Sequence, residues 1–223
     1  MSRNELRRAS AHVLVDDVEA PALSESDAHH VFRVLRVRDG DAVTVTDGAG
    51  AWRTCVAADQ SLTPQSDVRR TPPRPTPLTV AFAIPKQDRP EWIVQKLTEI
   101  GIDRIVPLRA ERSIVRWNGD RTARHLVKLR RVAVEALQQS RGVWLPEVAE
   151  PVDAAALLSA AVAAEPGARP IGPGDITVAI GPEGGWSPAE LEAAKDTVSL
   201  GATVLRVETA AIVAATHLVM HAE

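Results

Sequence analysis

The pattern of hydrophobic and polar positions changes near residue 75. Before that point, apolar and polar residues alternate in short runs, most clearly over residues 42–46, with glycine-containing turns at 39–41 and 47–50. Such alternation between turns is typical of half-buried strands. Residues 52–56 fit the return strand of a hairpin, and residues 27–35 fit a short helix. We therefore expect a small β-rich domain over residues 1–73.

A proline-rich segment separates this region from the rest of the chain. Residues 71–77 read Thr-Pro-Pro-Arg-Pro-Thr-Pro, with four prolines in seven residues. Proline has no backbone N–H and fixes φ, so this segment can be neither a helix nor an inner strand. It is predicted to be a stiff linker, with a second domain over residues 74–223.

Beyond the linker, buried strands alternate with helices. Apolar runs predict strands at 78–84, 105–108, 176–180 and 204–207, and helical spacing predicts helices at 88–101, 121–140 and 208–222. Ser187-Pro188-Ala189-Glu190 has the form of a capping box that opens another helix. This alternation predicts an α/β fold, in which helices cover both faces of a parallel sheet.

Composition narrows the class of protein. Cys55 is the single cysteine of the 223 residues, which excludes disulfides within the chain and cysteine-rich zinc sites. No apolar run approaches the roughly 18 residues of a membrane helix, and residues 1–8 lack the apolar core of a secretory signal. His29 and His30 have no further ligands at useful spacing. We expect a cytoplasmic protein with no membrane partner and no metal site.

The charge is unevenly distributed. The net charge is −3, but residues 76–145 carry 13 Lys and Arg against 7 Asp and Glu, whereas residues 146–223 carry 3 against 11. The basic segment could form a local phosphate-binding face, or its cations could simply be solvated helix faces. Composition leaves both interpretations open.

The segment Gly181-Pro182-Glu183-Gly184-Gly185 lies between the strand at 176–180 and the capped helix, where open α/β sheets bind ligands. It lacks the Lys of a nucleoside-triphosphate loop and the glycine spacing of a dinucleotide fingerprint, and Glu183 would repel phosphates. A neutral or cationic ligand fits better, such as adenosine with a sulfonium tail. The alternative is a tight turn that needs glycine for its backbone angles.

Several blocks of the sequence resemble one family. "IGPEGGWSPAE" (180–190) and "LGATVLRVETAA" (200–211) are similar to the RsmE-type family of SPOUT-class methyltransferases, which methylate N3 of a uridine in 16S ribosomal RNA. "HHVFRVLRVRDGD" (29–41), "KLTEIGIDRIVPLRAERSIVRW" (96–117) and "RRVAVEALQQSRGVWLPEV" (130–148) match further blocks in the same order. The chain departs from the family at 202–203, where Pro-Arg is usual, and at 138, where Glu is usual.

The resemblance implies a PUA-like β-barrel domain followed by a SPOUT domain with a trefoil knot. It implies S-adenosylmethionine as the cofactor, 16S ribosomal RNA of the small ribosomal subunit as the substrate, and a homodimer. The final helix, 208–222, is a candidate for the dimer interface.

The resemblance and the positions after the strands together give three sets of candidate residues. The cofactor-binding candidates are Ile180, Gly181, Pro182, Glu183, Gly184, Gly185, Leu200, Gly201, Leu205, Arg206, Thr209 and Ala210. The catalytic candidates, which would stabilise an anion developing on the uracil oxygens, are Arg112, Arg116 and Arg206. The RNA-binding candidates, expected to contact phosphates, are Arg33, Arg36, Arg38, Lys86, Lys96 and Arg109.

Some of these residues have alternative roles, and no general base is assigned. Arg206 and Glu208 could form a structural pair, and Thr209 could cap the final helix. Trp186 could line the cofactor pocket, and Trp117 could stack on a base.

Other functions also stay open. The enzyme could methylate another base or a ribose, or the chain could be a noncatalytic RNA-binding protein of ribosome assembly without cofactor affinity. The missing fingerprints count against an NAD or nucleotide enzyme acting on small molecules.

Overall fold

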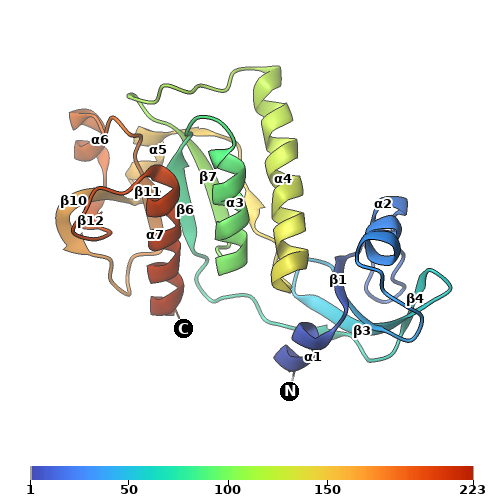
Figure 1. Ribbon diagram of the computed structural model, residues 1–223. Coiled ribbons are helices and arrows are strands. Elements are labelled where there is room, and N and C mark those ends of the chain that lie inside the picture. The colour runs from blue at the N-terminus through green and yellow to red at the C-terminus, as the bar shows by residue number, and fades with distance from the viewer. Residues whose placement is uncertain (1, 223) are drawn as a thin grey trace. The chain divides into compact units, whose positions relative to one another are not determined.

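The structure is a computed structural model that describes the backbone of residues 2–222 and the side chains of residues 4–222 (Figure 1). It contains two compact units: residues up to 74 together with 134–145, and residues 75–133 together with those from 146 onward. The long helix α4 (Asp120–Ser140) contributes residues to both units. None of the helices described is both long and apolar enough to cross a membrane.

The first unit is built on a mixed sheet in the order β1-β2-β3-β4, with β5 also pairing with β3. β1 and β2 are parallel and the other pairs are antiparallel. The predicted hairpin is confirmed as β2 and β3, and the predicted short helix is confirmed as α2 followed by a π-helix, η1. The elements are α1 (Ser2–Arg8), β1 (Ala11–Leu14), α2 (Glu25–His29), η1 (His30–Val34), β2 (Ala42–Thr46), β3 (Ala51–Ala58), β4 (Ser61–Pro64) and β5 (Arg69–Arg70).

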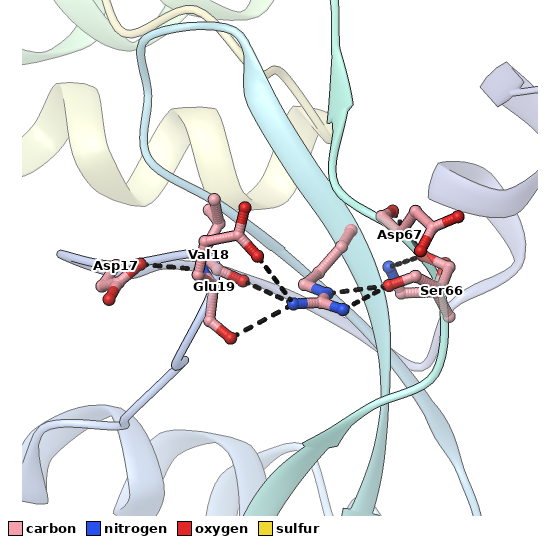
Figure 2. A network of polar contacts seen from close by, with 7 residues as sticks. Asp17, Val18, Glu19, Ser66 and Asp67 are labelled. Carbon is pink, nitrogen blue, oxygen red and sulfur yellow. Dashed lines mark hydrogen bonds and ion pairs between the residues drawn. The ribbon is translucent and has the colours of Figure 1, made fainter.

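The side chain of Arg53, on β3, hydrogen-bonds to the backbone of two loops of this unit. Its side chain is 13% exposed, and its Nη1 donates to the backbone oxygens of Val18 and Glu19, each at 3.2 Å. Its Nε donates to the backbone oxygen of Ser66 at 2.9 Å (Figure 2). Both loops therefore depend on one guanidinium group with fixed donor directions.

His12 on β1 is buried in the same unit. Its Nε2 lies 2.8 Å from the backbone oxygen of Gly142 and its Nδ1 lies 2.8 Å from Oγ1 of Thr44. Because a carbonyl can only accept, the neutral ring donates from Nε2 and accepts the threonine hydroxyl at Nδ1. Burial lowers the pKa of His12 from 6.5 to about 4.

The second unit is a parallel sheet in the order β12-β10-β11-β6-β7-β8, with β9 also pairing with β7. α7 packs on β6 and β11, and α3 lies beside α7 (Figure 1). α5 packs against the apolar core formed by β6, β7 and β10. The elements are β6 (Thr79–Ala83), α3 (Arg89–Ile100), β7 (Arg104–Arg109), β8 (Glu147–Val148), β9 (Val152–Asp153), α5 (Ala154–Leu158), β10 (Val162–Pro170), β11 (Thr177–Ile180), α6 (Pro188–Ala193), β12 (Asp196–Ser199) and α7 (Val207–Ala222).

Most predicted elements of this unit are confirmed, but the strand expected at 204–207 is wrong. The last strand is β12, and residues 200–206 form a loop that leads into α7. Gly201 has φ of 148° and Val204 is 85% exposed, so the apolar residues after Gly201 do not enter the sheet. Because α7 begins at Val207, Thr209 lies inside the helix and does not cap it. The trefoil knot stays a prediction.

Candidate functional site

A cavity of about 230 Å³ lies at the carboxyl ends of β11 and β12; we call it the first cavity. Loops that follow two strands of an open α/β sheet thus enclose one space, as expected for a ligand site in this fold class. The structure brings nine of the twelve cofactor-binding candidates to its lining: Ile180, Gly181, Pro182, Glu183, Gly185, Leu200, Gly201, Leu205 and Ala210.

Trp186 fixes the base of the glycine loop, residues 181–185. Its ring is 4% exposed and lines the first cavity, and its Nε1 donates to the backbone oxygen of Ala164 at 3.1 Å. A Cβ on Gly181 would lie 2.9 Å from this ring, which is closer than real Cβ atoms approach other heavy atoms. Gly181 is therefore required by the close approach of the indole.

The other two glycines of the loop have different requirements. Gly185 has φ of 69°, in the left-handed region, and its N–H donates to the backbone oxygen of Pro182 at 2.8 Å. A Cβ on Gly184 would meet Cβ of Arg112 at 3.5 Å, which is ordinary contact. Arg112 also donates from Nη1 to the backbone oxygen of Gly184 at 3.2 Å.

Glu190 connects the glycine loop and α6 to the segment after β7. Both hydrogen bonds of the predicted capping box with Ser187 are present. The second carboxylate oxygen of Glu190 accepts the N–H of Glu111 at 2.8 Å, and the side chain is 4% exposed. One buried carboxylate thus holds two loops at the carboxyl edge of the sheet, a role that the capping-box pattern indicated only in part.

The first cavity is electrostatically suited to a cationic group. Of the described residues that line it, none is Lys or Arg, whereas Glu165 and Glu183 are acidic. Arg89, on α3, forms ion pairs with two carboxylates: its Nη1 lies 3.4 Å from Oε1 of Glu183, and its Nε lies 3.7 Å from Oε1 of Glu208. Glu208 therefore pairs with Arg89. Its other oxygen, Oε2, is buried and makes no hydrogen bond within the described part of the chain.

Three cofactor-binding candidates do not line the first cavity. Gly184 packs against Arg112, while Arg206 and Thr209 are exposed near the start of α7. Sequence reasoning missed part of the lining, because β10 bulges between 164 and 169 and no sequence pattern marked that strand. The lining residues outside the candidate set are Ala164, Glu165, Pro166, Trp186, Ser199, Thr203, Val204 and Val207.

The catalytic and RNA-binding candidates are in different surroundings. Arg116 lines another cavity of this unit, the second cavity. Nζ of Lys96 lies 2.8 Å from Oε1 of Glu99, and Nε of Arg109 lies 2.9 Å from Oδ1 of Asp153. Both cations therefore already have anionic partners. The remaining RNA-binding candidates are all exposed: Lys86 in the second unit, and Arg33, Arg36 and Arg38 in the first.

Comparison with known proteins gives the family. A model described as an RNA methyltransferase domain matches residues 72–219, and one described as an RNA methyltransferase PUA domain matches residues 23–58. A protein named ribosomal RNA small subunit methyltransferase E from Mycobacterium tuberculosis is 33% identical over 89% of this chain and 86% of its own length. This chain belongs to the same RNA methyltransferase family. The Synechocystis relative of the same name is also 33% identical, over 86% of this chain and 70% of its own.

Solved structures support the family assignment. A probable rRNA methyltransferase from Porphyromonas gingivalis is 30% identical, with a TM-score of 0.75 over 93% of this chain and 96% of its own. A putative methyltransferase from Legionella pneumophila, solved in complex with the cofactor S-adenosylmethionine, is 27% identical, with a TM-score of 0.79 and the same coverage. The predicted SPOUT-type parallel sheet and the PUA-like domain are thereby confirmed.

Proposed function

We propose that this protein transfers a methyl group from S-adenosylmethionine to N3 of a uridine in 16S ribosomal RNA of the small ribosomal subunit. The family and the names of its relatives support methylation of small-subunit ribosomal RNA. The choice of uridine N3 follows from the resemblance of the sequence blocks. We infer from the same resemblance that the enzyme acts as a homodimer; a cytoplasmic location stays a prediction.

The observation that carries the proposal is the first cavity, enclosed by the glycine loop and residues 199–207. S-adenosylmethionine combines an adenosine with a cationic sulfur. Backbone groups and the apolar side chains of Ile180, Leu205 and Val207 suit the adenosine. The carboxylate of Glu165 suits the positive charge, which a cavity lined by Lys or Arg would repel. Glu183 adds a second carboxylate, whose charge is partly offset by its pairing with Arg89.

The chemistry requires that N3 of the uridine loses its proton and is aligned with the methyl group. Bound S-adenosylmethionine supplies a methyl group on a positively charged sulfur. The loops around the first cavity would hold the donor in one orientation, and such alignment is worth orders of magnitude in rate. Arg112 is held against the glycine loop by its bond to Gly184. Its guanidinium could therefore stabilise negative charge that develops on a uracil oxygen.

The test begins with calorimetric titration of the protein with S-adenosylmethionine. The wild type should bind, and Gly181→Val should weaken binding at least about tenfold because its side chain displaces the Trp186 ring. Gly184→Ala is the matched control and should bind within about twofold, because its Cβ has room. Circular dichroism melting would show that each variant is folded.

Methylation of undermethylated small ribosomal subunits, followed by mass spectrometry of the nucleosides, then identifies the product. N3-methyluridine supports the proposal, while a 2′-O-methylated ribose or another methylated base would replace it with a different acceptor. A folded wild type that does not bind S-adenosylmethionine would instead favour a noncatalytic role in ribosome assembly.

A further inference from the structure

The second cavity, of about 330 Å³, lies in the second unit among residues 85–91, 115–117 and the first turns of α4. These segments follow β6 and β7, so the second cavity opens at the same carboxyl edge of the sheet as the first. Its volume is within the range of small-ligand sites. Nothing in the family comparison assigns a ligand to it.

The cations of this cavity are favourably placed for an anion. Arg116, Arg121 and Lys128 line it, from the loop before α4 and from α4 itself, together with Asp88 and Glu91. Lys128 is paired with Glu91, so the guanidinium groups of Arg116 and Arg121 are the ones offered to an anion. Arg116 and Arg121 are exposed, so neither guanidinium has to be desolvated before it meets a ligand. Cations of the basic segment, residues 76–145, thus gather at the second cavity, whereas the charged residues that line the first cavity are acidic.

Two aromatic rings form one wall of the cavity. Trp117 and His125 stack with centroids 4.4 Å apart and planes inclined by 9°. Trp117 is 6% exposed and therefore rigidly packed, whereas His125 is half-buried. Because the two rings cover each other, the face of His125 that points away from Trp117 is the planar surface offered to an unstacked base, as in many single-stranded RNA sites.

Glu91 offers a hydrogen-bond acceptor inside the cavity. Its Oε1 accepts from Nζ of Lys128 at 2.7 Å, and the side chain is 15% exposed. Its Oε2 is buried and has no hydrogen-bond partner among the residues described. A buried carboxylate oxygen without a donor is costly, and every nucleobase has an N–H on its pairing edge that could satisfy it.

We propose that the second cavity binds one unstacked nucleotide of the RNA substrate, distinct from the nucleotide that is methylated. The base lies against the Trp117–His125 wall and donates an N–H to Glu91, and its phosphates contact Arg116 and Arg121. In the sequence, Arg89 stands between Asp88 and Pro90, which line this cavity. Its side chain pairs with Glu183 of the first cavity, so the two sites are neighbours. The proposal rests on the proposed function, because it takes RNA as the substrate.

The test compares Arg121→Ala and His125→Ala with Arg124→Ala, which removes the same charge from an exposed position of α4 outside the cavity. Steady-state methylation of small ribosomal subunits gives KM and kcat, and calorimetry gives the affinity for S-adenosylmethionine. We expect Arg121→Ala and His125→Ala each to raise KM about tenfold. Cofactor affinity should be unchanged in both, and Arg124→Ala should stay within about twofold of the wild type.

The dependence of RNA affinity on salt adds a second readout. Loss of one phosphate contact should reduce the slope of log affinity against log salt by about 0.7 to 1 in Arg121→Ala and leave it unchanged in His125→Ala. If His125→Ala melts at a lower temperature than the wild type, its KM also reflects lost stability, and the KM and salt slope of Arg121→Ala then test the proposal.

Equal KM values for Arg121→Ala, Arg124→Ala and the wild type would overturn the subsite while leaving the methyltransferase proposal standing. A wild type that neither binds S-adenosylmethionine nor methylates the small ribosomal particle would overturn both.

Discussion

Buried His12 couples the stability of the first unit to pH. Its pKa is lowered from 6.5 to about 4 because burial disfavours the charged ring. The folded protein therefore binds fewer protons than the unfolded chain between these values, and stability falls as pH falls through that window. Above pH 6.5 the full stability is present, and about 3 kcal/mol is lost by pH 4.

Chemical denaturation at several pH values between 7 and 4 would check this prediction. His12→Gln removes the titrating group, so its free energy of unfolding should vary less over the same window. His217, exposed on α7, supplies the control variant His217→Gln, which should keep the wild-type pH dependence. Parallel curves for His12→Gln and the wild type would contradict the prediction.

The glycine loop gives a contrast between adjacent residues. Gly185 has φ of 69°, where an L side chain costs roughly 1–2 kcal/mol, whereas a methyl group on Gly184 meets only ordinary contacts. We expect Gly185→Ala to lower the free energy of unfolding by about 1 kcal/mol and Gly184→Ala to change it by less than about 0.5 kcal/mol. Urea denaturation measures both, and equal effects would show that the left-handed backbone at Gly185 is unimportant.

At the scale of elements, α6 depends on one carboxylate. Glu190, which is 4% exposed, closes the capping box with Ser187 and also accepts the N–H of Glu111. Glu190→Ala should lower the free energy of unfolding by about 2 kcal/mol, because it removes a cap and leaves buried donors unpaired. Exposed Glu192 on the same helix is the control, and Glu192→Ala should have little effect. Similar values for both variants in denaturant melts would contradict this role.

The elements that sequence patterns predicted are those whose signals are local. Asp88, Pro90 and Gly101 bound α3 as expected, and Gly101 takes the left-handed conformation of a helix end. The capping box at 187–190 opens α6, and apolar runs mark β6, β7 and β11. In each case the residues that specify the element lie within it or at its ends.

The errors occur where distant residues decide the structure. β10 contains Glu165, Pro166 and Gly167, which are poor strand residues, yet pairing with the edge strand β12 on both sides of a bulge keeps them in the strand. The run 204–207 looked like a strand, but Gly201 precedes it and no neighbouring strand pairs with it in the described sheet. The glycine loop could therefore be located from the sequence, whereas the bulged side of the first cavity could not.

At the scale of the whole molecule, charge and cavity chemistry agree. The acidic segment from 146 onward supplies Glu165 and Glu183 to the first cavity. The basic segment before it supplies three cations, Arg116, Arg121 and Lys128, and two acids, Asp88 and Glu91, to the second. A cationic methyl donor and an anionic RNA need opposite potentials at neighbouring sites. The net charge of −3 conceals this division, so the small overall charge is no argument against RNA as the substrate.

The exposed end of α7 offers a test of the proposed homodimer. One side of this helix is buried in its own unit, yet Met220 is 70% exposed near its end. If α7 pairs with a second copy, Met220→Glu would place a charge in the interface, which is costly without a partner. Light scattering should then give the chain mass of 23.9 kDa for this variant and twice that mass for the wild type.

Val127→Glu is the matched control, because Val127 is 68% exposed on α4. This variant should remain dimeric, and its melting temperature should match that of the wild type, since its side chain does not pack in the core. Met220→Glu should melt at a temperature that no longer depends on protein concentration. A Met220→Glu protein that stays dimeric would exclude the end of α7 from the interface. A wild type that is monomeric at micromolar concentration would mean that each chain must form its cofactor site alone, with Val204 left exposed to solvent at the rim of the first cavity.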